Sequence, residues 1–188
     1  MQAGIRIRRA VEDDALALSV LAEATFRAAF AESNTASNMQ LHCATYYGQA
    51  LQLAEIRESS LETWVAELDR RLVAYMQLRF DAASPSFAGE RSVEIQRLYV
   101  DASHHGTGLA RELMAHAVAR ADAVGYAMLW LGVWERNARA LAFYRKWGFE
   151  VVGEHIFKVG ADPQRDLLMR RGVQSTATDP GRHSGRLG

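Results

Sequence analysis

The spacing of hydrophobic positions along the chain predicts an alternation of strands and helices. Residues 5–8 alternate between apolar and charged side chains, which is typical of a strand with one buried face. Residues 109–121 instead place apolar side chains every three or four positions, as an amphipathic helix does. Strands are predicted at 5–8, 61–67, 72–80, 94–100, 127–133, 149–159 and 166–170. Helices are predicted at 12–30, within 33–60 with a division at Gly48, from Leu109 to Gly125, and from Asn137 to Gly148. A polar loop at 81–91 and a turn at 160–164 complete the predicted elements.

Length and composition indicate an ordinary globular domain. The chain has 188 residues, 49% of them hydrophobic, and its acidic and basic residues balance. We expect one domain at 1–172 and, because 173–188 is rich in Gly, Ser, Thr, Pro and Arg, a disordered tail. The balanced charge gives no support for nucleic-acid binding. No apolar run approaches about 18 residues, so we expect no membrane-spanning helix.

Cysteine and histidine usage points to a reducing compartment and to a site without a metal. Cys43 is the single cysteine, which excludes an intrachain disulfide. The first residues resemble a strand and not a signal peptide, so we expect a cytoplasmic protein. His104 and His105 have no partners at metal-ligand spacing, and we expect them to form a solvated pair in a loop. A homodimer is left open as the oligomeric state.

A glycine loop between a strand and a helix is the stretch most suggestive of ligand binding. It comprises His105, Gly106, Thr107 and Gly108, and the helix follows at once. The first turn of a helix has unpaired N–H groups and a partial positive charge, and glycines let the backbone approach a pyrophosphate closely. The same loop can be a simple tight turn. A dinucleotide fingerprint is disfavoured because Arg111 occupies the third glycine position.

Two motifs in register resemble those of the GCN5-related N-acetyltransferases, enzymes that use acetyl-CoA. The first family signature is Arg or Gln, two residues, Gly, one residue, and Gly or Ala. The agreement in order and spacing extends from Ile5 to about Arg171. The signatures appear here as His105-Gly106-Thr107-Gly108-Leu109-Ala110, with His105 as a departure, and as Asn137, Ala140, Phe143-Tyr144, Lys146 and Gly148-Phe149.

A closer resemblance is to the bacterial PaiA-type spermidine/spermine acetyltransferases. It rests on WLGVWERNARALAFYRKWGF at 130–149, on DPQRDLLM at 162–169, and on Ser37-Asn38-Met39. None of these segments contains a residue that can be assigned to polyamine binding from the sequence. The resemblance therefore informs the chemistry more than the acceptor.

The family resemblance implies a fold and a set of cofactor contacts. The fold is a mixed α/β one: a mostly antiparallel central sheet of about seven strands flanked by helices, with the fourth and fifth strands splayed apart near Leu98. Acetyl-CoA is the implied co-substrate, and its pantetheine arm would add to the sheet like a strand. The implied cofactor-binding residues are Leu98, Tyr99, Val100, His105, Gly106, Thr107, Gly108, Leu109, Ala110, Asn137 and Tyr144.

Acetyl transfer to an amine needs a proton acceptor for the amine and a proton donor for the departing thiolate. By resemblance, Tyr144 is the donor and Glu94 the acceptor, acting through water. A thiol pKa of about 8.5 and a phenol pKa near 10 leave a small mismatch. Tyr144 can instead be a core residue on an apolar helix face. Glu94 can instead be a solvated strand residue paired with Arg97 or Arg79, and a bulge would decide whether it shares a face with Leu98.

We expect N-acetylation of a primary amine on a small molecule, with a polyamine such as spermidine or spermine first. A protein N-terminus or an amino-acid-like molecule is the second expectation. A regulatory protein that binds acetyl-CoA without turnover is the third, and Glu94 and Tyr144 argue against it. Because a polyamine carries several positive charges, its site should present carboxylates. The candidates are Glu32, Glu55, Glu58 and Glu90.

Overall fold

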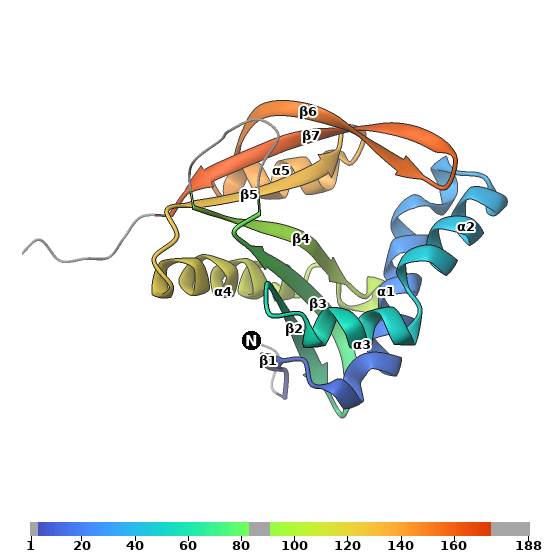
Figure 1. Ribbon diagram of the computed structural model, residues 1–188, viewed down its shortest axis with the longest axis horizontal. Helices are drawn as coiled ribbons and strands as arrows, with labels where there is room; N and C mark the ends of the chain where they lie inside the picture. Colours follow the sequence, from blue (N-terminus) through green and yellow to red (C-terminus); the bar gives the residue numbers. More distant parts are fainter. Residues whose placement is uncertain (1–3, 83–90, 174–188) are drawn as a thin grey trace, which may run out of the picture.

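The computed structural model describes residues 4–82 and 91–173, and a single sheet organises this part of the chain (Figure 1). The strands are β1 (Arg6–Arg9), β2 (Leu61–Leu68), β3 (Arg71–Phe80), β4 (Ser92–Val100), β5 (Met128–Trp134), β6 (Glu150–Val159) and β7 (Asp162–Gly172). The helices are α1 (Ala15–Phe30), α2 (Ala36–Tyr46), α3 (Gln49–Arg57), α4 (Leu109–Ala123) and α5 (Ala138–Lys146), with short 3₁₀ turns at 12–14, 31–33 and 102–104. The strand order is β1-β2-β3-β4-β5-β7-β6, and every pairing except β4–β5 is antiparallel.

The element order agrees with the prediction, and one boundary needs correction. The last strand begins at Asp162 and not at 166, so the turn before it is shorter than predicted. Pro163 sits in the β6–β7 ladder opposite Lys158, although proline lacks an N–H. It is tolerated there because β5 pairs with β7 only from Asp166 onward, which leaves this end of β7 open on its other side.

Two predicted segments, a loop and a tail, lie largely outside the described residues. Most of the predicted loop at 81–91 and the predicted tail from 174 onward lie outside them. Val173, the first residue of the predicted tail, still donates a hydrogen bond from its backbone N–H to the carbonyl of Ala127.

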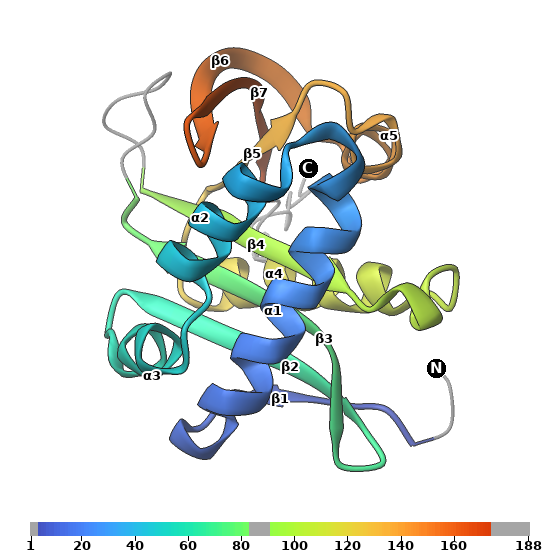
Figure 2. The ribbon, with the colours of Figure 1, turned by 90° about the vertical axis from the view of Figure 1, so that its right-hand side faces the viewer.

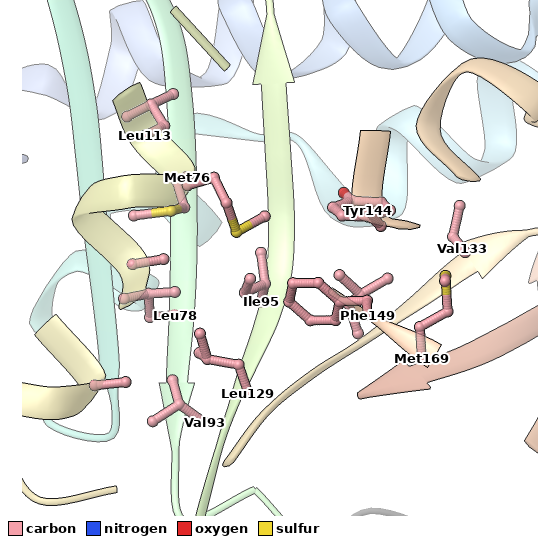
Figure 3. Close-up of a cluster of buried hydrophobic side chains, with 14 of the residues drawn as sticks. Met76, Leu78, Val93, Ile95, Leu113, Leu129, Val133, Tyr144, Phe149 and Met169 are labelled. Atoms are coloured by element: carbon pink, nitrogen blue, oxygen red, sulfur yellow. The ribbon is translucent and has the colours of Figure 1, made fainter. Parts of the chain in front are cut away.

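Apolar side chains form two cores, one on each face of the sheet. On one face Leu113 of α4 belongs to a single cluster of buried side chains that also contains Met76, Ile95 and Phe149 (Figure 3). On the other face α1 presents Leu18, Ala22 and Phe26, whose spacing of four residues gives one apolar helix stripe. Figure 2 shows α1 and α2 in front of the sheet and α4 behind it.

The β6–β7 turn docks onto α2. Gly160 in this turn has φ +61°, and a Cβ there would lie 2.8 Å from both Cα and the carbonyl oxygen of Asn38. The N–H of Ala161 donates to Oδ1 of Asn38 at 3.3 Å, and Nε2 of Gln164 donates to Oδ1 of Asn34 at 2.7 Å. The turn at 160–161 thus contacts Asn38, and Gln164, from the segment 162–169 that carried part of the closer family resemblance, contacts Asn34 four residues earlier.

The two middle strands of the sheet, β4 and β5, separate early. They pair in parallel only at Ser92–Glu94 against Met128–Trp130, and the rest of β4 pairs with β3 alone. Beyond Glu94 the β4 edge that faces β5 is left without a strand partner. Gln96 adds a bulge, because Gln77 faces Arg97 while the next β3 residue, Leu78, faces Ile95.

The docking of the turn on α2 gives a stability prediction. Gly160→Ala should lower the free energy of unfolding by about 2–4 kcal/mol, because it combines a left-handed backbone with a clash against the backbone of Asn38. Urea denaturation measures the change. Gly172→Ala is the matched control, since a Cβ there meets nothing within 4 Å and no left-handed backbone is involved. Equal losses in the two variants would contradict the tight docking.

Candidate active site

A cavity of about 250 Å³ lies where β4 and β5 separate. Its walls come from both faces of the sheet, which the gap between the two strands connects. Tyr144 of α5 enters from one side, and aromatic residues of α1 and α2 close the other. Its lining comprises Phe26, Phe30, His42, Tyr46, Tyr47, Ile95, Gln96, Arg97, Leu98, Tyr99, Gly132, Val133, Trp134, Asn137, Ala140, Tyr144, Phe157 and Asp166.

The glycine loop leads directly into α4 as predicted. Gly106 and Gly108 have φ of +79° and +90°, a conformation that L side chains rarely adopt, and Gly108 is the N-cap of α4. A Cβ at either glycine would meet nothing within 4 Å. Leu109 is buried in the core, while Ala110 is half-buried in the first turn. The loop thus presents open backbone at a helix start, which suits an anion.

The side chain of His105 ties this loop to β4 and α5. Nη1 of Arg139 donates to Nδ1 of His105 at 2.9 Å, and Nε2 of His105 lies 2.9 Å from the carbonyl oxygen of Val100. Because a guanidinium can only donate, Nδ1 must accept, and the ring proton lies on Nε2, which donates to Val100. Thr107 anchors the loop from within, since its hydroxyl donates to the carbonyl of His104 at 2.8 Å.

The bulge in β4 reverses which side chains share a face. Val93 and Ile95 before the bulge and Leu98 after it pack into the α4 core, while Tyr99 packs into the α1–α2 core. Glu94 therefore lies on the face opposite Leu98. Arg97 and Tyr99 share the face of Glu94, which the uninterrupted spacing would not have indicated.

Glu94 is placed near the cavity without lining it. Its Oε2 lies 3.5 Å from Nη1 of Arg79, so one of the two alternative partners expected from the sequence is the one present. Burial is the main cause that raises the pKa of Glu94, and the charges of Arg79 and Arg97 oppose the rise. Any role for Glu94 in proton transfer requires ordered water between it and the amine.

Arg97, the other partner considered for Glu94, pairs with Glu55 instead. Its Nη1 lies 2.6 Å from Oε2 of Glu55, and the two side chains are 11% and 15% exposed. Its guanidinium carbon also lies 5.7 Å from the centroid of the Tyr47 ring. Glu55, one of the carboxylates considered for a polyamine site, thus neutralises an arginine of the cavity wall. Glu32 and Glu58 are exposed and do not line the cavity, and Glu90 lies outside the described residues.

Tyr144 stands on α5, whose start is set by Asn137. Oδ1 of Asn137 accepts the N–H of Ala140 at 3.0 Å, which is the helix cap predicted from the sequence. Tyr144 is 9% exposed and lies between β4 and β5 near Phe149 (Figure 3). Burial raises the pKa of its phenol, with a smaller contribution from Tyr99. Tyr144 therefore keeps its proton at neutral pH, and it both packs in the core and lines the cavity.

Asp166 of β7 is a cavity residue that the sequence interpretation did not select. Burial raises the pKa of its carboxyl to about 6. It pairs in register with Trp134 of β5 and His155 of β6. Its position beside β5 depends on long-range strand register, and its surrounding motif, DPQRDLLM, gave no local signal for a site.

The described residues contain no group of three or more His, Cys, Asp or Glu side chains able to hold a metal ion. Instead, Nδ1 of His104 bonds to the hydroxyl of Ser103 at 2.8 Å, and His105 is occupied by Arg139 and Val100. Within the same residues, no helix is long and apolar enough to cross a bilayer.

Comparison with known proteins identifies the family. The model of the acetyltransferase (GNAT) family matches residues 23–149. The chain belongs to this family. GNAT enzymes are acyltransferases that take acetyl-CoA as co-substrate, and the cavity at the β4–β5 separation with the glycine loop beside it suits such a molecule.

Relatives and solved structures agree with this assignment. An uncharacterised N-acetyltransferase of Lactobacillus delbrueckii subsp. lactis is 26% identical over 170 residues, 90% of this chain and 98% of the relative. An uncharacterised N-acetyltransferase of Mycobacterium tuberculosis is 39% identical over 107 residues, 56% of this chain and 64% of the relative. The PaiA N-acetyltransferase of Thermoplasma acidophilum in complex with coenzyme A has a TM-score of 0.74 at 20% identity, covering 90% of this chain and 99% of that one. The ribosomal-protein-S18-alanine N-acetyltransferase of Escherichia coli has a TM-score of 0.65 at 16% identity, covering 94% and 97%.

The glycine loop gives a prediction for acetyl-CoA binding. Gly108→Glu should abolish binding, because a carboxylate at the start of α4 fills the open backbone and repels phosphate. Isothermal titration calorimetry measures the affinity. Gly125→Glu is the matched control, since Gly125 also has a positive φ of +75° and open space but lies beyond the C-terminal end of α4. Unchanged affinity in a folded Gly108→Glu variant would refute the loop assignment.

Proposed function

We propose that the protein transfers the acetyl group of acetyl-CoA directly to a primary amine that enters the cavity from the α1–α2 side. The observation that carries the proposal is the cavity itself, which reaches from Tyr144 of α5 through the β4–β5 gap to Phe26, Phe30 and His42. A thioester bound along the free edge of β4 would meet an amine arriving from the opposite face. The two reactants then approach each other from different sides without competing for one entrance.

The cofactor contacts follow from the free edge of β4 and the loop after it. We assign the backbone of Leu98 to the acetyl oxygen and Val100 to the pantetheine arm, with Tyr99 between them in the strand. The Val100 carbonyl already accepts from His105, and its second lone pair remains for a pantetheine amide. We assign the N–H groups of residues 106–110 to the pyrophosphate, because the N–H of His105 already donates to the carbonyl of Ala102 at 3.2 Å. Asn137 contacts the cofactor from α5 while its side chain caps that helix.

Tyr144 is the proposed proton donor to the leaving thiolate. Burial raises the phenol pKa of Tyr144 and so increases its difference from the thiol pKa of about 8.5. Proton transfer from Tyr144 to a fully formed thiolate is therefore less favourable than transfer from a free phenol. Burial instead keeps the Tyr144 hydroxyl protonated at every working pH. This O–H can then donate a hydrogen bond to the sulfur as the C–S bond breaks. The phenol then regains a proton from the new amide nitrogen.

The amine also needs a proton acceptor, and Glu94 is the first candidate for this role. Glu94, assigned from the family resemblance, remains a proposed base that acts through ordered water. Water is needed because Glu94 is paired with Arg79 and lies outside the cavity lining.

A polyamine remains the first proposed acceptor, and a peptide N-terminus or amino-acid-like amine the second. The structural similarity to the Thermoplasma PaiA enzyme and the cavity carboxylate Asp166 support a cationic amine. Arg97 in the wall supports the second candidate, because its guanidinium has further N–H donors besides the one paired with Glu55 and can donate to the carbonyl next to an α-amine. A ribosomal-protein alanine acetyltransferase of similar fold agrees with that alternative.

Removal of the Tyr144 hydroxyl tests its role as proton donor. Tyr144→Phe should lower kcat by about 10²–10⁴-fold, because the ring still packs in the core but no longer donates a proton. Acetyl-CoA affinity should stay close to wild type. Tyr126→Phe is the matched control, since Tyr126 is a buried tyrosine of the same core that does not line the cavity. A kcat within about twofold of wild type would reduce Tyr144 to a packing residue.

A turnover screen with acetyl-CoA tests the function and ranks the acceptors. The panel comprises spermidine, spermine, simple alkyl amines and short peptides with free N-termini, with release of coenzyme A as the readout. We expect spermidine or spermine to exceed a monoamine in kcat/KM, with an advantage that shrinks as salt rises. Equal or better turnover of the peptides would favour the second candidate. Binding of acetyl-CoA without turnover of any amine would overturn the proposed function.

A further inference from the structure

Asp166 places a carboxylate on the acceptor side of the cavity. On β7 it lies opposite Trp134 on one neighbouring strand and His155 on the other. Trp134 contacts the α1–α2 core, and so does Phe157, two residues beyond His155 on the same strand face. Asp166 therefore points to the side of the sheet from which we propose that the amine enters.

The strand beside Asp166 leaves room for it. Gly132 of β5 has no side chain at the point where a Cβ would lie 3.4 Å from Oδ2 of Asp166 and 3.1 Å from Cε1 of His155. Glycine weakens the interior of a strand and often marks a close approach by another group. Here it lets the two polar side chains lie against the β5 backbone at the edge of the cavity, which Gly132 also lines.

Asp166 has no partner for its charge among residues 4–82 and 91–173. No hydrogen bond or ion pair reaches it, and burial alone raises the pKa of its carboxyl to about 6. The titratable groups around it are Tyr99 of β4 and His155 of β6. Burial, and to a lesser degree the charge of Asp166, raise the pKa of Tyr99, whereas burial lowers that of His155. His155 is thus neutral beside Asp166 at pH 7, and its Nδ1 is buried without a hydrogen bond.

The remaining ionisable groups of the cavity leave Asp166 as its uncompensated charge. Arg97 is neutralised by Glu55 at 2.6 Å. Burial lowers the pKa of His42 and raises those of Tyr47 and Tyr144, so all three are neutral at pH 7. A half-buried carboxylate without a partner costs stability, and a cation from outside would remove that cost.

We propose that Asp166 binds the ammonium group of the acceptor and accepts its proton before attack. This inference rests on the proposed acetyl transfer and supplies its base. The R–NH₃⁺ group gives one proton to the Asp166 carboxylate, which later releases it to solvent. The free amine attacks the thioester carbon, the C–S bond breaks, and Tyr144 gives its proton to the sulfur. Tyr144 then recovers a proton from the nitrogen, so the products are the N-acetyl amine, coenzyme A and one released proton.

The assignment predicts an acceptor class. One ammonium fits at Asp166, and the aromatic wall formed by Phe26, Phe30 and Tyr47 suits the apolar body that carries it. Amines that are protonated at the working pH should depend on Asp166. Amines that are already neutral at that pH should be acetylated without help from Asp166.

The test compares two amines of one shape in wild type and Asp166→Asn. Ethylamine is protonated at pH 7.5, whereas 2,2,2-trifluoroethylamine is largely neutral because its fluorines withdraw electrons. We expect Asp166→Asn to lower kcat/KM by about 100-fold for ethylamine and for the best acceptor of the panel, but by no more than about threefold for the fluorinated amine. Acetyl-CoA affinity, measured by calorimetry, should be unchanged. Asp162→Asn is the matched control, since Asp162 lies on the same face of β7 outside the cavity lining.

A stability measurement separates this role from a structural one. The folded-state pKa of Asp166 is raised from 3.8 to about 6, so between those values the folded protein binds more protons than the unfolded chain. The contribution of Asp166 to stability therefore falls as pH rises through that window. Asp166→Asn should raise Tm at pH 7.5 and leave it nearly unchanged at pH 4. A structural aspartate would show a lower Tm at pH 7.5.

The outcomes are distinguishable. Equal losses for both amines, or a lower Tm at pH 7.5, would overturn the role of Asp166. A defect confined to protonated amines in Glu94→Gln, with Asp166→Asn active, would overturn it in favour of Glu94. A wild type that binds acetyl-CoA but acetylates no amine would overturn the proposed function and this inference together.

Discussion

The early separation of β4 and β5 is the constraint on which the rest of the site depends. Two parallel strands that stay paired leave no backbone groups for a ligand, whereas here the pairing stops after Glu94 and Trp130. The free edge of β4 then needs partners, and an extended molecule with amide groups can supply them. The same gap connects the two faces of the sheet. A thioester and an amine that enter from opposite faces of the sheet can therefore meet at this gap.

Packing on both faces holds the separated strands in place. The α4–α5 core fixes one side, and the β6–β7 turn that docks on Asn38 fixes the α1–α2 side through α2. The bulge at Gln96 then sets which face each β4 side chain takes, with Leu98 toward the α4 core and Arg97 and Tyr99 toward the α1–α2 side. Because a single extra residue does this sorting, the electrostatics of the cavity depend on a local irregularity in an otherwise regular strand.

The sequence allowed prediction of the features that depend on local spacing. The glycine loop, the cap at Asn137 and the position of Tyr144 all follow from residues close together in the chain, and so did the order of the elements. The partner of Arg97 and the place of Asp166 depend on register between strands far apart in sequence, which no local pattern encodes. The β7 boundary was missed for a related reason. Pro163 is tolerated only because β5 ends before it, and that is a property of the sheet and not of the segment.

The central claim is that the thioester lies in the β4–β5 gap between Tyr144 and Asp166. A crystal structure with bound coenzyme A tests it most directly. We expect the pantetheine arm along the free edge of β4, the pyrophosphate at the glycine loop, and the sulfur within hydrogen-bond reach of the Tyr144 hydroxyl, with Asp166 facing it from the α1–α2 side. Coenzyme A bound away from this gap, or a sulfur remote from Tyr144, would contradict it.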